Sequence, residues 1–183
     1  MIESVNEAES EGRKVIVFSF FLDTIRKVSM LLGDRCTNPI NGSVTPQRRQ
    51  EVIDEFDKAP AETVLVVQIQ SGGTGLNIQS ASVVILCEPQ FKPSIENQAI
   101  SRAYRMGQTR NVLVYRLLCE GTVDEKIVST LESKQAIFDA FADKSVAAME
   151  SQKLDDRTFG NIIKEEIDRI NAKYGNTEQR STE

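Results

Sequence analysis

The chain has 183 residues, of which 40% are hydrophobic and 27% charged, with a formal net charge of -5 and no histidine. This length and balance suit one soluble globular domain, or one domain with a helical appendage. The missing imidazole excludes Ser-His-Asp and Cys-His nucleophiles and mixed Cys/His zinc sites. We therefore expect any general acid or base to be Asp, Glu, Lys, Tyr or Cys, and we expect no metal site in the chain itself.

The three cysteines, Cys36, Cys87 and Cys119, are far apart and form no C-x-x-C pair. We expect them to be buried structural thiols in a reducing compartment. The first residues do not resemble a secretory signal, and the longest apolar run, residues 15–22, is too short to cross a bilayer. The sequence predicts a soluble intracellular protein without a membrane partner.

Short β-branched runs alternate with helical patterns along the first two thirds of the chain. Continuous aliphatic runs are typical of parallel strands buried on both faces. They predict strands at residues 14–19, 63–67, 82–87 and 112–117, with a weaker candidate at 35–40. The helical patterns lie at 22–32 and 45–56, and the second begins with Thr45 as cap and Pro46 at the first position. This alternation predicts a layered α/β domain with right-handed crossovers.

After Gly121 the pattern becomes helical. We expect Thr122 to cap one or two helices that run to Phe141 and pack on the domain, followed by a loop over 145–158. An amphipathic final helix at 162–170 either braces two lobes or completes the core, and core packing is favoured. The predicted domains are residues 1–144, a linker with the trailing helix at 145–174, and a disordered polar tail at 175–183.

The first candidate site is the glycine-rich run Ser71-Gly72-Gly73-Thr74-Gly75-Leu76-Asn77, directly after a predicted strand. Glycine amides at the end of a parallel strand can approach a ligand closely. The dinucleotide fingerprint fails because Ile78 stands where its third glycine belongs, and no Gly-Lys-Ser/Thr of a P-loop occurs in the chain. A tight turn without a ligand is the alternative interpretation.

The second candidate site is the run from Gln98 to Gln108, which we expect to be a helix opened by Pro93 and ended by Gly107. Spacings of four and three place Gln98, Arg102 and Arg105 on one face, where two guanidinium groups would clamp a phosphoryl group. The surrounding segment 89–119 carries a net charge of about +4, which indicates a localised anionic ligand. A solvated arginine face is the alternative.

Several segments, in their order along the chain, resemble those of the second RecA-like lobe, the helicase C-terminal domain, of Swi/Snf-type superfamily-two DNA-dependent ATPases. The resemblance covers about residues 13–135, and the matching segments are 14–19, 41–43 with Arg49, Ile53 and Phe56, 71–77, 88–93 with Glu96 and Gln98, 98–108, 115–117 and 121–125. It implies a RecA-like parallel sheet sandwiched by helices, with additional C-terminal helices. Gln90 and Phe91 stand where relatives have paired tryptophans.

The resemblance also implies half of an ATPase. In that family the first lobe carries the P-loop and the Asp-Glu motif, so ATP and Mg²⁺ would bind only with that lobe present. Arg105 and Arg102 would act as arginine fingers, and Gln98, Gly75 and Asn77 would line the ATP cleft. The expected contacts to the backbone of double-stranded DNA are Ser19, Gly42, Ser43, Gln70, Ser71, Gly72, Gly73 and Thr74.

Position 70 is glutamine where relatives often have a basic residue, so we expect weak, salt-sensitive DNA binding by this lobe alone. The main hypothesis is an excised second lobe of a DNA translocase or remodeller, with the first lobe of the same polypeptide and DNA as partners and further protein partners left open. The alternative is a complete, non-catalytic module that binds nucleic acid or a partner through a degenerate helicase lobe. An RNA helicase of the same superfamily is less favoured. The resemblance implies a cytoplasmic, nucleoid-associated protein in a bacterium or a nuclear one in a eukaryote, and a bacterial source is favoured.

Overall fold

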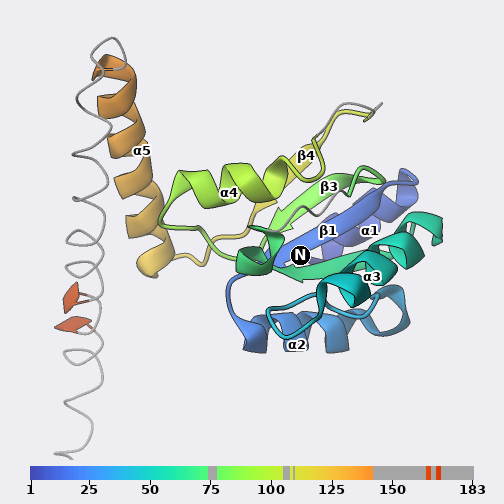
Figure 1. Cartoon of the computed structure of the whole chain (residues 1–183). Helices are drawn as coiled ribbons and strands as arrows, with labels where there is room; N and C mark the ends of the chain where they lie inside the picture. Colours follow the sequence, from blue (N-terminus) through green and yellow to red (C-terminus); the bar gives the residue numbers. More distant parts are fainter. Residues whose placement is uncertain (74–77, 105–107, 109, 142–163, 166–167, 170–183) are drawn as a thin grey trace, which may run out of the picture. The chain divides into compact units, whose positions relative to one another are not determined.

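The computed structural model describes residues 1–73, 78–104, 108, 110–141, 164–165 and 168–169 (Figure 1). The chain divides into two compact units, Met1–Leu118 and Cys119–Glu183. The predicted boundaries after residues 144 and 174 lie outside the described residues and stay predictions. Most of the predicted final helix also lies outside them, although residues 164–165 and 168–169 are helical.

The first unit contains a four-stranded parallel sheet in the order β2-β1-β3-β4. Its strands are β1 (Lys14–Ser19), β2 (Val64–Gln68), β3 (Ala81–Leu86) and β4 (Leu113–Arg116). Ile16 of β1 is in register with Leu65 on one side and Val84 on the other. The four predicted strands are confirmed. The weaker candidate at 35–40 instead contributes two isolated bridges, Cys36 to Val64 and Ile40 to Val67.

Helices cover both faces of this sheet, as Figure 1 shows. On one face lie α1 (Ile2–Ser10) and α2 (Leu22–Leu32); on the other lie α3 (Pro46–Lys58) and α4 (Pro93–Ile100). Alternate residues of β1 serve the two cores, because side chains alternate across a strand. Ile16 and Phe18 pack with α3 and α4, whereas Val15 and Val17 pack with α1 and α2. The RecA-like α/β fold is confirmed.

Local sequence signals fix the ends of α3. Thr45 Oγ1 accepts a hydrogen bond from Arg48 N at 3.3 Å, and Pro46 occupies the first helical position. The helix runs two residues beyond the predicted end. It stops where Ala59 becomes extended, which is the conformation that the following Pro60 favours.

Two helices differ from expectation. Helix α1 was not predicted, although Val5 and Ala8 are three residues apart and both are buried. The helix expected to run to Met106 ends at Ile100. After Ile100 the N–H groups of Arg102 and Ala103 bond the carbonyls three residues back, Ala99 at 3.1 Å and Ile100 at 3.0 Å, so the chain turns more tightly than an α-helix. The Arg102 carbonyl accepts from Ile78 N at 3.2 Å.

The second unit contains α5 (Val123–Phe141), which confirms helical structure after Gly121. Thr122 Oγ1 accepts from Asp124 N at 3.3 Å, so the predicted cap is present. Cys119 is exposed, and Cys36 and Cys87 are only partly buried. The expectation of three buried thiols is therefore wrong for Cys119. Among the described residues, no helix combines the length and the apolar character needed to cross a membrane.

Candidate nucleic-acid interface

Those expected DNA contacts that the structure describes lie at or beside the carboxyl ends of the parallel strands, together with Gln68 and Glu88, which were not expected there. Ser19 ends β1, Gln68 ends β2, and Glu88 follows β3 by two residues. The segments around Gly42 and Ser71 join this edge through hydrogen bonds to Gln68. In an open α/β sheet ligands bind at these carboxyl ends of the strands, which we call the carboxyl edge; the amino-terminal ends form the opposite edge.

Gln68 joins three of these segments. Its Oε1 accepts from Gly42 N at 3.1 Å and from Ser71 Oγ at 3.3 Å, and its Nε2 donates to the Phe20 carbonyl at 3.3 Å. The sequence interpretation did not assign a role to Gln68. A polar residue at the last position of an otherwise aliphatic strand was the signal that could have identified it.

Arg49 holds the loop before α3 against the glycine-rich segment. Its guanidinium donates to the carbonyls of Val44 at 2.8 Å, Asn41 at 3.3 Å and Ser71 at 3.4 Å. Ser43 N and Ser43 Oγ both donate to Asn41 Oδ1, at 2.9 and 2.6 Å. The loop is therefore fixed by internal contacts, while Gly42 and Ser43 themselves stay exposed.

Ser19 lies in the same network but is almost completely buried, with 1% of its surface exposed. Its hydroxyl donates to Glu88 Oε2 at 3.1 Å and accepts from Phe21 N at 3.1 Å, and Glu88 Oε1 accepts from Phe20 N. The DNA contact expected of Ser19 stays a prediction. In this structure its side chain connects the end of β1 to Glu88, two residues after β3.

The glycine-rich run begins in a short 3-10 helix, Ile69–Gly73, that packs against α4. Gln70 is exposed, whereas Ser71 is 7% exposed. Gly72 and Gly73 belong to this 3-10 helix. The remaining expected contacts of this run, Thr74, Gly75 and Asn77, lie outside the described residues.

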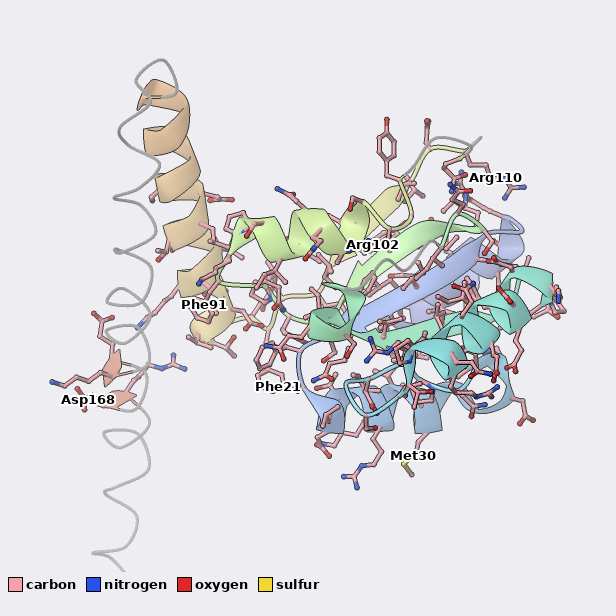
Figure 2. The ribbon with its side chains drawn as sticks, viewed as in Figure 1. Phe21, Met30, Phe91, Arg102, Arg110 and Asp168 are labelled. Atoms are coloured by element: carbon pink, nitrogen blue, oxygen red, sulfur yellow. The ribbon has the colours of Figure 1, made fainter. Side chains whose placement is uncertain are left out.

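Gln98 and Arg102, the two described residues of the expected phosphoryl clamp, do not share a helix face. Gln98 is exposed on α4, whereas Arg102 lies in the turn after the helix and is 6% exposed (Figure 2). The prediction of a common face is therefore wrong for Gln98 and Arg102, because the helix ends too early. Ile78 N donates to the Arg102 carbonyl, which places that turn beside the end of the glycine-rich run. Arg105 lies outside the described residues.

The basic segment does not gather its cations in one place. Arg116 forms an ion pair with Glu96, with Nε and Oε2 2.7 Å apart, and Arg102 is buried. Arg110 donates to the Gly12 carbonyl at 2.8 Å at the amino-terminal end of β1. The positive charge of residues 89–119 thus does not mark a single anion site among the described residues.

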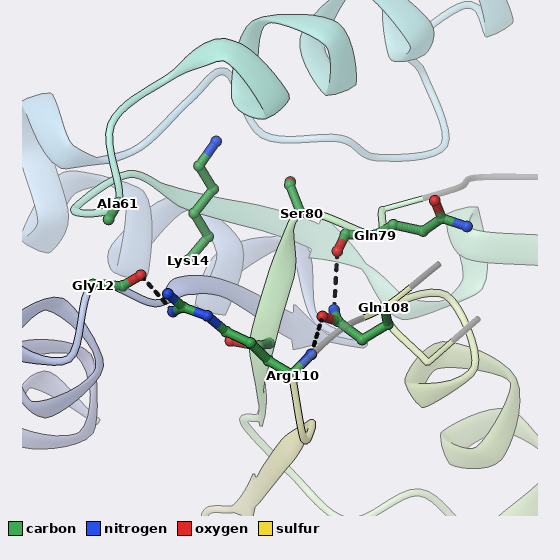
Figure 3. A pocket seen from close by; sticks show the side chains of 8 residues that line it. Gly12, Lys14, Ala61, Gln79, Ser80, Gln108 and Arg110 are labelled. Atoms are coloured by element: carbon green, nitrogen blue, oxygen red, sulfur yellow. Dashed lines mark hydrogen bonds between the residues drawn. The ribbon is translucent and has the colours of Figure 1, made fainter. Parts of the chain in front are cut away.

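A pocket of about 320 Å³ lies near the amino-terminal ends of β1 and β3, at the edge opposite the candidate interface (Figure 3). Lys14 and Arg110 are two of its lining residues. Burial lowers the pKa of the Lys14 ammonium, and the nearby Asp57 opposes this effect. Gln108 also lines the pocket and donates to the carbonyls of Gln79 at 2.9 Å and Ala81 at 2.8 Å. Its amide fastens the end of the expected clamp segment to β3.

The electrostatics at the carboxyl edge keep the neighbouring thiol neutral. Burial, with a contribution from the Glu88 charge, raises the pKa of Cys87 to about 12. No group of three histidine, cysteine or acidic side chains in the part of the chain that the structure describes is arranged to hold a metal ion.

A parallel sheet covered on both faces, with polar loops at the carboxyl ends of its strands, defines a RecA-like α/β domain. The chain belongs to the helicase conserved C-terminal domain family, which matches residues 1–107. Its relatives are SNF2-family proteins, and its structural neighbours are SWI2/SNF2 ATPase lobes.

Two curated relatives illustrate the similarity. The SNF2 domain-containing protein ENL1 of Oryza sativa subsp. japonica is 34% identical over 141 residues, which is 75% of this chain and 14% of that protein. The putative ATP-dependent helicase/translocase YwqA of Bacillus subtilis is 30% identical over 161 residues, or 85% of this chain and 17% of that protein. The chain thus spans less than a fifth of the length of these relatives.

Solved structures give the same family. The SWI2/SNF2 ATPase core of Sulfolobus solfataricus in complex with dsDNA matches with a TM-score of 0.60 and 32% identity, covering 76% of this chain and 30% of that one. The C-terminal part of the Fun30 ATPase domain matches with a TM-score of 0.62 and 28% identity, covering 70% of this chain and 44% of that one.

Proposed function

We propose that this chain is the C-terminal lobe of an ATP-dependent double-stranded DNA translocase or remodeller, and that its carboxyl edge contacts the DNA phosphate backbone. The observation that carries this proposal is the convergence of Gly42 N and Ser71 Oγ on the Gln68 side chain at the ends of parallel strands, with Ser43 held beside Gly42 by Asn41. Backbone amides and short hydroxyl side chains suit phosphate contacts, which position a protein without reading base sequence. The SWI2/SNF2 core solved with dsDNA supports the choice of ligand.

The second half of the proposal concerns ATP. The nucleotide and Mg²⁺ would be held by a first lobe that supplies the P-loop and the Asp-Glu motif. No P-loop occurs in this sequence, and its two Asp-Glu pairs, at 54–55 and 124–125, lie within helices α3 and α5. This lobe would supply Arg105 as an arginine finger that neutralises charge developing on the transferred phosphoryl group. The burial of Arg102 favours a positioning role for it rather than direct contact with the nucleotide. Gln98 is exposed and free of such packing constraints, so it can face the cleft.

The test is DNA-stimulated ATP hydrolysis by a polypeptide that carries a first lobe in front of this chain. We expect Arg105→Ala to lower turnover by about 10³-fold or more, the scale of an arginine finger. Arg110→Ala is the matched control, because Arg110 is exposed and lies at the opposite edge of the sheet. The 183-residue chain alone should not hydrolyse ATP. Equal rates for the two variants would exclude the finger, and hydrolysis by the chain alone would exclude the half-enzyme.

A non-catalytic module is the second candidate function. One observation favours it: the donors Gly42 N, Ser43 N and Ser71 Oγ already bond acceptors within the chain. In that case DNA or a protein partner would bind the same edge, and Arg105→Ala would leave binding unchanged with no ATP turnover to lose. The two functions are separated by measuring both quantities on the same set of variants. Nuclear or nucleoid residence follows from the translocase and from a module that binds DNA, but not from a module that binds only a protein partner.

A further inference from the structure

The orientation of the Gln68 side-chain amide is fixed by its partners. The Gly42 N–H can only donate, so it must face the amide oxygen. The Phe20 carbonyl can only accept, so it must face the amide nitrogen. The Ser71 hydroxyl adds a second donor to the oxygen at 3.3 Å. Gln68 Oε1 is therefore an acceptor on which a backbone amide and a hydroxyl converge.

These two donors belong to the set that the proposed function assigns to DNA phosphates. We infer that Gln68 Oε1 occupies a subsite for a phosphate oxygen, formed by the Gly42 N–H and the Ser71 hydroxyl, and that a backbone phosphate of DNA displaces it. This inference rests on the proposed DNA contact and names the group that must leave for the contact to form. Gln68 thereby acts as an internal competitor of DNA.

The space around the subsite permits the exchange. A Cβ placed on Gly42 would have only two atoms within 4 Å, Gln68 Oε1 at 3.7 Å and Ser71 Oγ at 3.9 Å, so the Gln68 amide that would be displaced is the main neighbour on this side of Gly42. Gly42 is exposed and Gln68 is partly exposed, which lets a ligand enter and the displaced amide turn into water. The exchange therefore requires a side-chain rotation at the surface and leaves the buried strand residues in place.

The direction of the exchange follows from charge. Gln68 Oε1 is a neutral acceptor, whereas a phosphate oxygen carries negative charge, and hydrogen bonds to a charged acceptor are about twice as strong. Displacement also breaks the bond from Gln68 Nε2 to the Phe20 carbonyl. DNA binding at Gly42 would thus also free the Phe20 carbonyl, just after β1, from its hydrogen bond. A ligand at Gly42 would therefore change the contacts of both segments.

The experiment uses the 183-residue chain and two substitutions of Gln68. Gln68→Ala empties the subsite. Gln68→Glu keeps an acceptor there and adds a negative charge that repels phosphate. Gln50→Ala, on an exposed position of α3, is the matched control. Affinity for a short fluorescein-labelled DNA duplex is measured by anisotropy at low ionic strength, and circular dichroism verifies folding of every variant.

We expect Gln68→Ala to bind the duplex about 3- to 10-fold more tightly than the unmodified chain, the equivalent of one neutral hydrogen bond. Gln68→Glu should bind more weakly than both, and Gln50→Ala should not change. If Gln68→Ala instead weakens binding, Gln68 is a positioning residue and the inference is wrong. If the duplex binds but neither substitution changes its affinity, the DNA contact stands and the subsite is wrong.

A second measurement tests the subsite without DNA. The Gly42 amide resonance is followed by ¹H–¹⁵N NMR during titration with inorganic phosphate. We expect the resonance to shift at lower phosphate concentration in Gln68→Ala than in the unmodified chain, because the competing oxygen is gone. A shift in the variant, with no duplex binding by any protein, would retain the anion subsite and overturn the proposed DNA contact. Equal titrations would overturn the subsite.

Discussion

Arg116 Nε donates to Glu96 Oε2 at 2.7 Å and so joins the last strand of the sheet, β4, to helix α4. The other carboxylate oxygen, Glu96 Oε1, accepts from Gln90 N at 3.0 Å. One buried carboxylate therefore connects three segments: the turn after β3, the helix that precedes the Arg102 turn, and β4. The glutamate side chain is 7% exposed and the arginine side chain 46% exposed, so the carboxylate depends on its partners more than the guanidinium does.

The first prediction concerns this pair. We expect Arg116→Ala to lower the free energy of unfolding by about 1.5–3 kcal/mol, because it leaves a buried carboxylate without its cation. Adding Glu96→Gln to Arg116→Ala should recover part of this loss, since the neutral amide still accepts from Gln90 N but carries no buried charge. Urea unfolding followed by circular dichroism measures the unmodified chain, Arg116→Ala, Glu96→Gln and the double variant. An additive effect of the two substitutions would show that the pair is not coupled.

The central elements of the fold were predictable because each carries an unambiguous local signal. The bounds of β1 and α2 match the aliphatic run and the amphipathic stripe residue for residue. The end of α4 was not predictable from its own residues. The residues after Ile100 form tighter turns, and the Arg102 carbonyl bonds Ile78 N, a tertiary partner that nothing within residues 93–106 encodes.

Only part of the candidate interface could be predicted, again because tertiary contacts cannot be read from the local sequence. Gly42, Ser43 and Ser71 were identified from the resemblance, and the structure brings their segments together. Gln68 and Glu88, which connect those segments, were missed because their roles depend on contacts between residues 26 to 69 positions apart. Ser19 shows the converse case: its position was expected, but burial gives its hydroxyl a partner that no local pattern indicates.

The second prediction concerns Lys14 at the opposite edge. Its ammonium donates to the carbonyls of Phe56 at 2.5 Å and Asp57 at 2.8 Å, in the last turn of α3, and lies 5.2 Å from the Phe56 ring centroid. A cation at a helix C-terminus stabilises the helix dipole. We expect Lys14→Met, which keeps the length but removes the charge and donors, to cost about 1–2 kcal/mol of unfolding free energy. Lys27→Met, at an exposed position of α2, is the control and should cost less, as surface pairs do.

The third prediction concerns thiol reactivity. Cys119 is exposed, whereas burial raises the pKa of both Cys36 and Cys87. The thiolate is the reactive form, so we expect one thiol to react quickly with a chromogenic disulfide near neutral pH and two to react slowly. Cys119→Ser should abolish the fast phase and leave the slow one. A fast phase that persists in this variant would contradict the assignment.

The fourth prediction follows from the Cys87 pKa, which is about 12 in the folded chain against an ordinary value of 9.0. Between these values the unfolded chain loses the thiol proton while the folded chain keeps it. The stability supplied by the protonated thiol is therefore fully present below pH 9 and declines as the pH rises, by at most about 1.4 kcal/mol per pH unit. Unfolding measured at about pH 8 and about pH 10 should show a larger loss for the unmodified chain than for Cys87→Ala. An equal loss of unfolding free energy in the two proteins would contradict this prediction.

The last prediction separates stability from ligand binding at Gly42. This residue has no positive φ, and a Cβ there would make only ordinary contacts of 3.7 and 3.9 Å with Gln68 Oε1 and Ser71 Oγ. Gly42→Ala should therefore change the unfolding free energy by less than about 1 kcal/mol, in the direction of greater stability if the unfolded chain loses flexibility. The same methyl group would stand beside the Gly42 N–H, where a phosphate oxygen must come within about 3 Å. We expect duplex affinity to fall while urea unfolding and the circular dichroism spectrum stay those of the unmodified chain. If Gly42→Ala binds DNA as tightly as the unmodified chain, Gly42 is not part of the interface, because the added methyl group is the one difference between the two proteins.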